Sequence, residues 1–284
     1  MNKSTHPFLQ LLVMMAIALV MLLVSGLLSM ALAVAGVDVT LASGLLWLQG
    51  LTQVLCFILP VLLMGMIYYK GRQRDFFRLD FSGPKWLLGL AGVVIMLLLV
   101  PLNELLAEWN DSWQLGRLGE WMRSLQDQTE GITEQLLGNP TVGGLLASLL
   151  VVALIPAVSE ELFFRGGVQN LLERWFGNAH AAIWVTAVVF SLGHGEVFSF
   201  VPRFVMGATL GYLYVYGRSL VPNMLAHFVN NAVVVVLYWL VARGVLDIDP
   251  EAPIGFDTLL TVCCTLAAAG VFAVSFVKRQ KISR

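Results

Sequence analysis

Charged residues are scarce in this chain of 284 residues. They make up 12% of the sequence, whereas hydrophobic residues make up 58%, and the mean hydropathy is +0.81. Soluble domains are close to half apolar and about a quarter charged, so this composition excludes an ordinary water-soluble domain. The formal net charge of −1 gives no indication of a nucleic-acid partner, and we expect none.

Cysteines and several catalytic motifs are also rare or missing. Cys56, Cys263 and Cys264 lie within apolar runs, as buried free thiols do, and they form neither a disulfide framework nor a CxxC metal pattern. The sequence has no GxSG serine motif, no GxGD aspartate motif and no HExxH zinc helix. These absences exclude the intramembrane peptidase classes that depend on those motifs.

Long apolar runs recur along the whole chain, each near the roughly 20 residues that cross a bilayer core as a helix. A backbone surrounded by lipid must satisfy its own hydrogen bonds, so these runs predict helices. We therefore predict an all-α, polytopic membrane helix bundle that forms a single membrane domain over residues 1–284. The eight predicted spans cover residues 8–35, 44–69, 86–106, 142–165, 181–194, 200–217, 220–242 and 257–277.

The first apolar run also resembles a signal peptide, because Ala31-Leu32-Ala33 matches a small-x-small cleavage site. However, the run from Phe8 to Val37 is about twice as long as the hydrophobic region of a usual signal peptide. We therefore expect an uncleaved first helix.

The distribution of basic residues predicts the orientation, because cytoplasmic loops of membrane proteins carry an excess of Lys and Arg. With eight spans and a cytoplasmic N-terminus, 13 of the 17 Lys and Arg residues fall on the cytoplasmic side. The four on the other side are Arg117, Arg123, Arg203 and Arg243. Both termini are therefore expected in the cytoplasm.

Residues 108–140 form a polar connection on the extracytoplasmic side. Its apolar residues recur at helical spacing, namely Leu115, Leu118, Met122 and Leu125. This spacing predicts an amphipathic helix on the outer membrane surface; a lid, a substrate-collecting element and a plain connecting loop are alternative roles. Residues 173–175 similarly predict a short interfacial helix after the fourth span.

Ionisable residues inside membrane helices cost about 2.5–3.5 kcal/mol on insertion scales, so they mark candidate functional sites. Glu160 and Glu161 lie near the end of the fourth predicted span. Glu161 and Arg165 are one turn apart and can pair on one helix face. Glu160 then lies about 100° around the helix, without that partner, and is available as a general base. The alternative is that both glutamates reach from a helix end into the lipid headgroups.

Two of the four histidines, His194 and His227, lie at membrane depth. His227 and Asn231 are one turn apart and point to the same side of their helix. An imidazole and an amide on one face provide donors suited to a developing oxyanion. A single buried histidine is otherwise more often a packing residue. Glu196, two positions after His194, is expected to be a loop carboxylate; the alternative is that it contacts and supports the catalytic residues.

Together these residues resemble the motifs of the CPBP family, the CAAX-protease and bacteriocin-processing intramembrane peptidases. The family pattern is Glu-Glu-x-x-x-Arg, then Phe-x-x-x-His, then His-x-x-x-Asn. In this chain the pattern reads Glu160-Glu161…Arg165, Phe190…His194 and His227…Asn231. The motifs occur in the family's order, each on its own predicted span. The resemblance covers about residues 142–235, the predicted peptidase core.

The resemblance implies an intramembrane endopeptidase that needs no cofactor and cleaves membrane-associated peptides or proteins, lipidated or not. The implied catalytic residues are Glu160, His194, His227 and Asn231, and the implied supporting residues are Glu161, Arg165 and Phe190. Glu160 and His194 would activate a water, His227 and Asn231 would stabilise the oxyanion, and Glu161 with Arg165 would hold the helix end and tune Glu160. The site would lie in the cytoplasmic half of the bilayer, in a bacterial inner (cell) membrane, with a role in CAAX processing, bacteriocin maturation or bacteriocin immunity.

Two other functions remain open at the level of sequence. A zinc-dependent metallopeptidase would bind its metal through Glu160, His194 and His227, which is a legitimate ligand set. A non-enzymatic immunity, scaffold or transport protein would use the same polar cluster for binding or proton relay.

Overall fold

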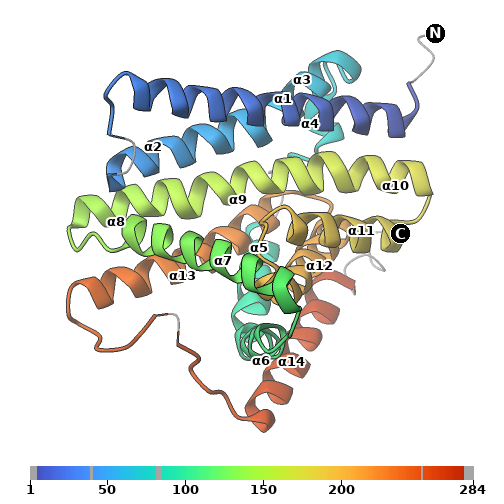
Figure 1. Ribbon diagram of the computed structural model, residues 1–284. Helices are drawn as coiled ribbons and strands as arrows, with labels where there is room; N and C mark the ends of the chain where they lie inside the picture. The colour runs from blue at the N-terminus through green and yellow to red at the C-terminus, as the bar shows by residue number, and fades with distance from the viewer. Residues whose placement is uncertain (1–4, 39–40, 81–84, 251, 278–284) are drawn as a thin grey trace.

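The computed structural model describes residues 5–38, 41–80, 85–250 and 252–277. Within these residues the chain is helical and contains no strand (Figure 1). The α-helices are α1 Pro7–Val34, α2 Ala42–Gln53, α3 Leu59–Tyr68, α4 Gln73–Phe76, α5 Lys85–Leu98, α6 Val100–Asp111, α7 Gly116–Leu137, α8 Val142–Ser148, α9 Ile155–Glu160, α10 Asn170–Phe176, α11 Ala179–Leu192, α12 Phe200–Gly217, α13 Val221–Ala242 and α14 Thr258–Phe272. Between them lie the π-helical stretches η1 Val54–Ile58, η2 Leu149–Leu154, η3 Glu161–Gln169 and η5 Ala273–Val277, and the 3₁₀ turn η4 Val197–Ser199.

The predicted polytopic helical bundle is confirmed, and the chain is an integral membrane protein. Among the described residues, five helices are long and apolar enough to cross a membrane, or six when the bent pair α5 and α6 counts as one span. The predicted segments 181–194 and 200–217 are helical, as α11 and α12, but neither is among those five or six. The count of eight spans stays a prediction.

The fourth predicted span is longer than expected. One helix runs from Val142 to Phe176, through α8, η2, α9, η3 and α10, over 35 residues. The predicted end at residue 165 and the separate interfacial helix at residues 173–175 are therefore wrong. Arg165 does not end the helix, because it is fully buried and paired. The helix ends at Gly177, whose φ of 64° is the left-handed conformation of a helix C-terminus. Glu160 consequently lies near the middle of this helix.

Prolines explain the irregular turns of the long helices. Proline has no N–H for the carbonyl four residues earlier. Pro60 and Pro156 lie two residues after the last residue of the π-helical stretches η1 and η2. In such a stretch each carbonyl bonds to an N–H five residues later, so the carbonyl opposite the proline still finds a donor. Pro101 has no such stretch before it, and the chain bends there by 44° between α5 and α6.

Small residues bring α12 close to its neighbours. A Cβ atom on Gly207 would lie 3.1 Å from the ring of Phe190, and one on Gly211 would lie 2.9 Å from Ile183 and from the amide oxygen of Gln169. Both glycines lie on one face of α12, four residues apart, as in the small-xxx-small packing of membrane helices. This close approach places the backbone of α12 against η3 and α11, where the candidate site lies.

Three helix ends lie together: the start of α1, the end of α3 and the end of α10. The orientation prediction places all three on the cytoplasmic side. The start of α1 meets the end of α10, where the rings of Phe8 and Trp175 are 4.4 Å apart. The end of α3 meets the start of α1, where the Tyr69 hydroxyl donates to Gln10 at 2.6 Å. In Figure 1 these ends lie at the right. The cytoplasmic orientation of that side stays a prediction.

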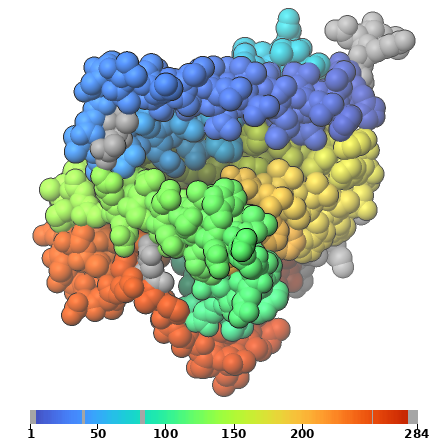
Figure 2. Space-filling view, in the orientation of Figure 1, coloured from blue at the N-terminus to red at the C-terminus, as the bar shows by residue number. Residues whose placement is uncertain are grey.

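The polar connection 108–140 contains the expected helix, α7, which packs against α2, α8 and α13. Apolar residues at helical spacing on its outer face are exposed: Leu118, Trp121, Leu125 and Ile132. Its first turns are tied inward by Arg123, which pairs with Asp111 at 2.6 Å and covers the ring of Phe198. Figure 2 shows α7 as a green ridge on the outside of the bundle. The exposed apolar face suits contact with lipid, whereas the position of α7 at the membrane surface stays a prediction.

Candidate active site

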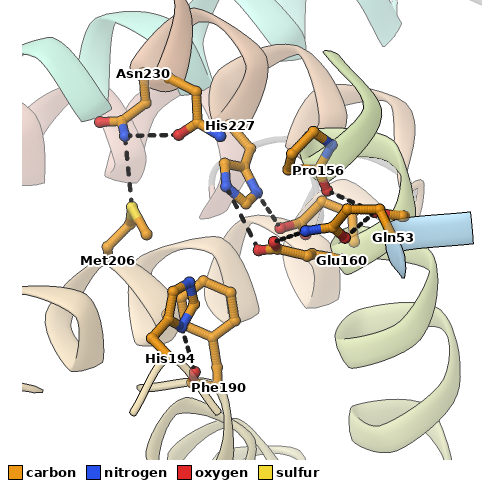
Figure 3. A network of polar contacts seen from close by, with 12 residues as sticks. Gln53, Pro156, Glu160, Phe190, His194, Met206, His227 and Asn230 are labelled. Carbon is orange, nitrogen blue, oxygen red and sulfur yellow. Dashed lines mark hydrogen bonds and ion pairs between the residues drawn. The ribbon is translucent and has the colours of Figure 1, made fainter. Parts of the chain in front are cut away.

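A cavity of about 730 Å³ lies between α2, α6, α7, α9, α12 and α13. Glu160 from α9, His194 from the turn after α11, and His227 and Asn231 from α13 all line it. The structure therefore brings the four predicted catalytic residues together around one cavity, although they come from three separate helical segments. Figure 3 shows three of them, Glu160, His194 and His227. Their catalytic roles stay predictions.

Glu161 is the centre of a fully buried polar network. The predicted pair with Arg165 is confirmed, with 2.7 Å between Nη1 and Oε1 and no exposure of either side chain. The same oxygen, Oε1, accepts from His227 Nδ1 at 2.9 Å, and Oε2 accepts from Asn223 Nδ2 at 3.2 Å. Glu161 thus joins the long helix to α13, and its predicted task of holding a helix end is wrong because this part of the helix is not an end.

The Arg165 guanidinium is compensated by more than its carboxylate partner. Nη2 donates to the carbonyl of Gly207 at 2.9 Å, and the guanidinium carbon lies 4.7 Å from the centre of the Phe190 ring. A buried charge without partners costs several kcal/mol, so these contacts explain how Arg165 is tolerated inside the bundle. The predicted supporting residue Phe190 therefore packs directly on the ion pair.

The Glu161 carboxylate determines that Nδ1 of His227 is a hydrogen-bond donor. A carboxylate only accepts hydrogen bonds, so His227 Nδ1 is the protonated donor. This orients the ring with Nε2 toward Glu160, whose Oε2 lies 4.0 Å away. That separation is too long for a direct hydrogen bond. It leaves Nε2 and the Glu160 carboxylate as two polar groups that a water or a substrate oxygen in the cavity can reach together.

His194 is oriented by the backbone. Its Nδ1 lies 2.8 Å from the carbonyl of Phe190, one turn earlier, and the two rings pack edge-on with centroids 4.9 Å apart. Because a carbonyl only accepts, Nδ1 carries the proton, and Nε2 of the neutral ring is an acceptor. Figure 3 shows this second nitrogen pointing away from the carbonyl, toward the side where His227 lies.

Asn231 is oriented by its neighbour in sequence. The Asn230 amide donates to Asn231 Oδ1 at 3.3 Å and also contacts the sulfur of Met206 at 3.7 Å. With its oxygen engaged in this way, Asn231 has its NH₂ group available as a donor. Asn230 also lines the cavity, so α13 contributes two adjacent amides to its wall.

Three polar residues of this site were not identified from the sequence. Gln53 donates from Nε2 to Glu160 Oε1 at 3.3 Å, although it belongs to the second span, where no functional residue was expected. Asn223 and Asn230 belong to α13 beside the predicted motif. The available signal was the same as for the glutamates: amide side chains inside apolar runs. Glu196, expected to be a loop carboxylate, pairs with Arg203 at the cavity wall.

The alternative zinc site is not formed by these residues as they stand. Among the described residues, no group of three or more His, Cys, Asp or Glu side chains is arranged to hold a metal ion. Glu160 and His227 approach each other at 4.0 Å. However, the other carboxylate that contacts His227 is Glu161, which does not face the cavity and so is not placed as a third ligand.

Comparison with known proteins concerns the segment that carries most of these side chains. Residues 142–233 match the family model described as type II CAAX prenyl endopeptidase Rce1-like. This segment, the Rce1-like segment, is similar to that family and makes up about a third of the chain. The match confirms the resemblance to the CPBP intramembrane peptidases and supports, at a coarse level, a membrane-bound protease. The Rce1-like segment contains all three sequence motifs, whereas Gln53 lies outside it. Searches of curated proteins and of solved structures give no match.

Proposed function

We propose that this protein is an intramembrane endopeptidase that hydrolyses a peptide bond of a membrane-associated peptide or protein. The observation that carries the proposal is the common cavity around Glu160, His194, His227 and Asn231. It offers one buried carboxylate, one imidazole acceptor and two groups that can donate. This set matches what peptide hydrolysis needs, namely a base for water and donors for an oxyanion.

The first step is attack by water. A water that hydrogen-bonds to Glu160 and to His194 Nε2 adds to the carbonyl carbon, and Glu160 takes one of its protons. The electron pair of the carbonyl double bond moves to oxygen. The resulting tetrahedral oxyanion accepts hydrogen bonds from His227 Nε2 and from the Asn231 amide.

The second step breaks the peptide bond. Glu160 delivers its proton to the amide nitrogen, the carbon–nitrogen bond breaks, and the oxyanion collapses to a carboxyl group. The products are a new carboxyl terminus and a free amine, with the atoms of one water divided between them. Glu160 therefore acts first as a base and then as an acid, and it ends each turnover ionised.

His227 donates to the oxyanion only when both of its ring nitrogens are protonated, because Nδ1 is already engaged by Glu161. The buried cluster then contains two carboxylates and two cations, Arg165 and His227, and is neutral. With an uncharged His227 it would hold one uncompensated negative charge, which is costly inside a membrane. Charge balance therefore supports a protonated His227.

The proposal also includes the surroundings of the site. We assign both termini to the cytoplasm of a bacterium whose inner membrane holds the protein, with a lipid-anchored or membrane-inserted substrate that reaches the cavity from the bilayer. Basic residues from separate helix ends lie together at one side of the bundle, where Arg174 covers the ring of Tyr69 and Arg78 pairs with Glu173, and they support this orientation.

A cleavage assay with the purified protein in detergent tests the proposal. The substrates are a farnesylated peptide with three residues after its cysteine and an unlipidated copy, and mass spectrometry identifies the cleaved bond. We expect cleavage by the wild type and a loss of at least about 100-fold in Glu160→Gln, because a carboxamide cannot accept the proton. Glu120→Gln, the same change at an exposed position on α7, should keep full activity.

Three results would contradict parts of this proposal. Wild-type activity in Glu160→Gln would reject Glu160 as the base. Loss of activity with a chelator and recovery with zinc would favour a metallopeptidase. Binding of both peptides without cleavage would favour a non-enzymatic membrane protein.

A further inference from the structure

Gln53 donates a hydrogen bond directly to the Glu160 carboxylate. Its Nε2 lies 3.3 Å from Glu160 Oε1. Gln53 is 8% exposed and Glu160 is 7% exposed, so water competes little for this contact. The two residues are 107 positions apart, and Gln53 belongs to α2, outside the Rce1-like segment.

Ser159 holds the amide of Gln53 from the other side. Its hydroxyl oxygen lies 2.8 Å from Gln53 Oε1 and 3.3 Å from the carbonyl oxygen of Pro156, and its side chain is fully buried. Gln53 is thus held between the Ser159 hydroxyl at one end of its amide and the Glu160 carboxylate at the other. Figure 3 shows Gln53 beside Glu160.

We propose that Gln53 is a positioning residue that holds Glu160 in place in both of its protonation states. When Glu160 is ionised, Gln53 donates to it through Nε2 and accepts the Ser159 proton at Oε1. When Glu160 has taken the proton of the attacking water, the amide turns by 180°. Gln53 Oε1 then accepts a hydrogen bond from the Glu160 acid, and Gln53 Nε2 donates one to the Ser159 oxygen. The Ser159 hydroxyl donates its own hydrogen bond to the Pro156 carbonyl.

Each group in this arrangement, the Glu160 carboxyl, both ends of the Gln53 amide and the Ser159 hydroxyl, has a hydrogen-bond partner in each state, and no proton is gained or lost by Gln53 or Ser159. This matters because a buried polar group without a partner costs about 1–3 kcal/mol. If Glu160 had hydrogen bonds only in its ionised form, these bonds would favour the carboxylate over the acid. Glu160 would then take up the proton of the attacking water less readily. Glutamine suits the position because its amide is both donor and acceptor on one short group.

The inference rests on the proposed peptidase activity, and its test uses three variants in the peptide-cleavage assay. Gln53→Met keeps the length of the side chain and removes both hydrogen-bonding atoms. We expect kcat to fall about 10- to 100-fold with little change in KM, because misplacement of a reacting group by about 1 Å has effects of this size. Ser159→Ala keeps the Gln53 Nε2 donor to Glu160 but removes the hydroxyl that bonds Gln53 Oε1. We expect a smaller fall in kcat, about fivefold.

The double variant tests whether Ser159 acts through Gln53. If Ser159 acts through Gln53, then Gln53→Met combined with Ser159→Ala has the kcat of Gln53→Met alone, because the second change has nothing left to disturb. If Ser159 and Gln53 act independently of each other, the two losses multiply. Gln114→Leu, a glutamine change at an exposed position, is the control and should match the wild type.

The outcomes are distinct from those of the proposed function. An active wild type, an inactive Glu160→Gln and a Gln53→Met with wild-type kcat would overturn the role of Gln53 alone. Multiplying losses would do the same. If the wild type cleaves nothing, a structure of Gln53→Met still decides, since the Glu160 carboxylate should leave its place beside His227. Should Gln53→Met not fold, Ser159→Ala carries the test, and unchanged kcat in that variant would count against the inference.

Discussion

Replacing Glu161 by glutamine should damage both stability and catalysis, for two separable reasons. Glu161 is the charge partner of Arg165 and the acceptor for His227 Nδ1. Glu161→Gln is nearly isosteric, so the cavity keeps its shape. Arg165 is left as a buried cation that retains the carbonyl of Gly207 and the ring of Phe190 but loses its only carboxylate contact in the described structure.

The expected cost follows from the burial. Breaking a buried ion pair by removal of one partner costs about 3–5 kcal/mol. The remaining contacts of Arg165 place this variant near the lower limit, about 3 kcal/mol. Total stabilities of proteins are about 5–15 kcal/mol, so the loss is large. The assay is unfolding in mixed micelles with increasing denaturing detergent, compared with the wild type.

A second variant distinguishes the two reasons. In Glu161→Gln combined with Arg165→Met no cation is left unpaired, so most of the stability should return. Activity should not return, because His227 still lacks the carboxylate that orients and charges it. A loss below about 1 kcal/mol in Glu161→Gln would refute the energetic argument. Full activity in the double variant would refute the link between Glu161 and His227.

Three further predictions concern the oxyanion, the packing and the orientation. Asn231→Ala should lower kcat by about 100- to 1000-fold at unchanged thermal stability, as loss of one oxyanion donor does; an unchanged kcat in the cleavage assay would remove Asn231 from the mechanism. Gly211→Ala should destabilise the fold by about 1–3 kcal/mol through overpacking against Ile183 and Gln169, whereas Gly26→Ala, where a Cβ meets nothing within 4 Å, should not; equal unfolding curves would contradict this. A phosphatase that is active only outside the cytoplasm, fused after residue 284, should be inactive, and activity there would reverse the predicted topology.

Much of the candidate site could be predicted because its residues are paired within single helices. Glu161 and Arg165, and likewise His227 and Asn231, are four residues apart, and this spacing alone places each pair on one face. Polar groups are costly in a bilayer, so their presence within apolar runs marks these residues as functional candidates. The same reasoning also predicts the helical class of the fold, because lipid leaves an isolated apolar segment no other way to satisfy its backbone.

The wrong predictions concern the end of the fourth span, where the same charged residues can either mark a membrane boundary or be buried and paired inside the bundle. Arg165 and the residues at 173–175 were interpreted as the end of a span and a new helix, since charges usually mark the membrane boundary. In the folded chain Arg165 is neutralised by Glu161 and enclosed by Gly207 and Phe190, so the helix continues to Phe176. A sequence shows that a charge is present, but not whether another helix will compensate it.

The sequence by itself determined the membrane class, the helical segments and the faces on which the motif residues lie, because these depend on hydrophobicity and on the helical repeat. Only the tertiary structure decided that His227 donates to Glu161 and that Gln53 donates to Glu160, across 66 and 107 residues of chain. Such contacts depend on which helices pack together, at what distance and with what rotation. Those quantities are set by the summed shape of many side chains, such as the missing Cβ atoms of Gly207 and Gly211, and no local spacing along the chain encodes them.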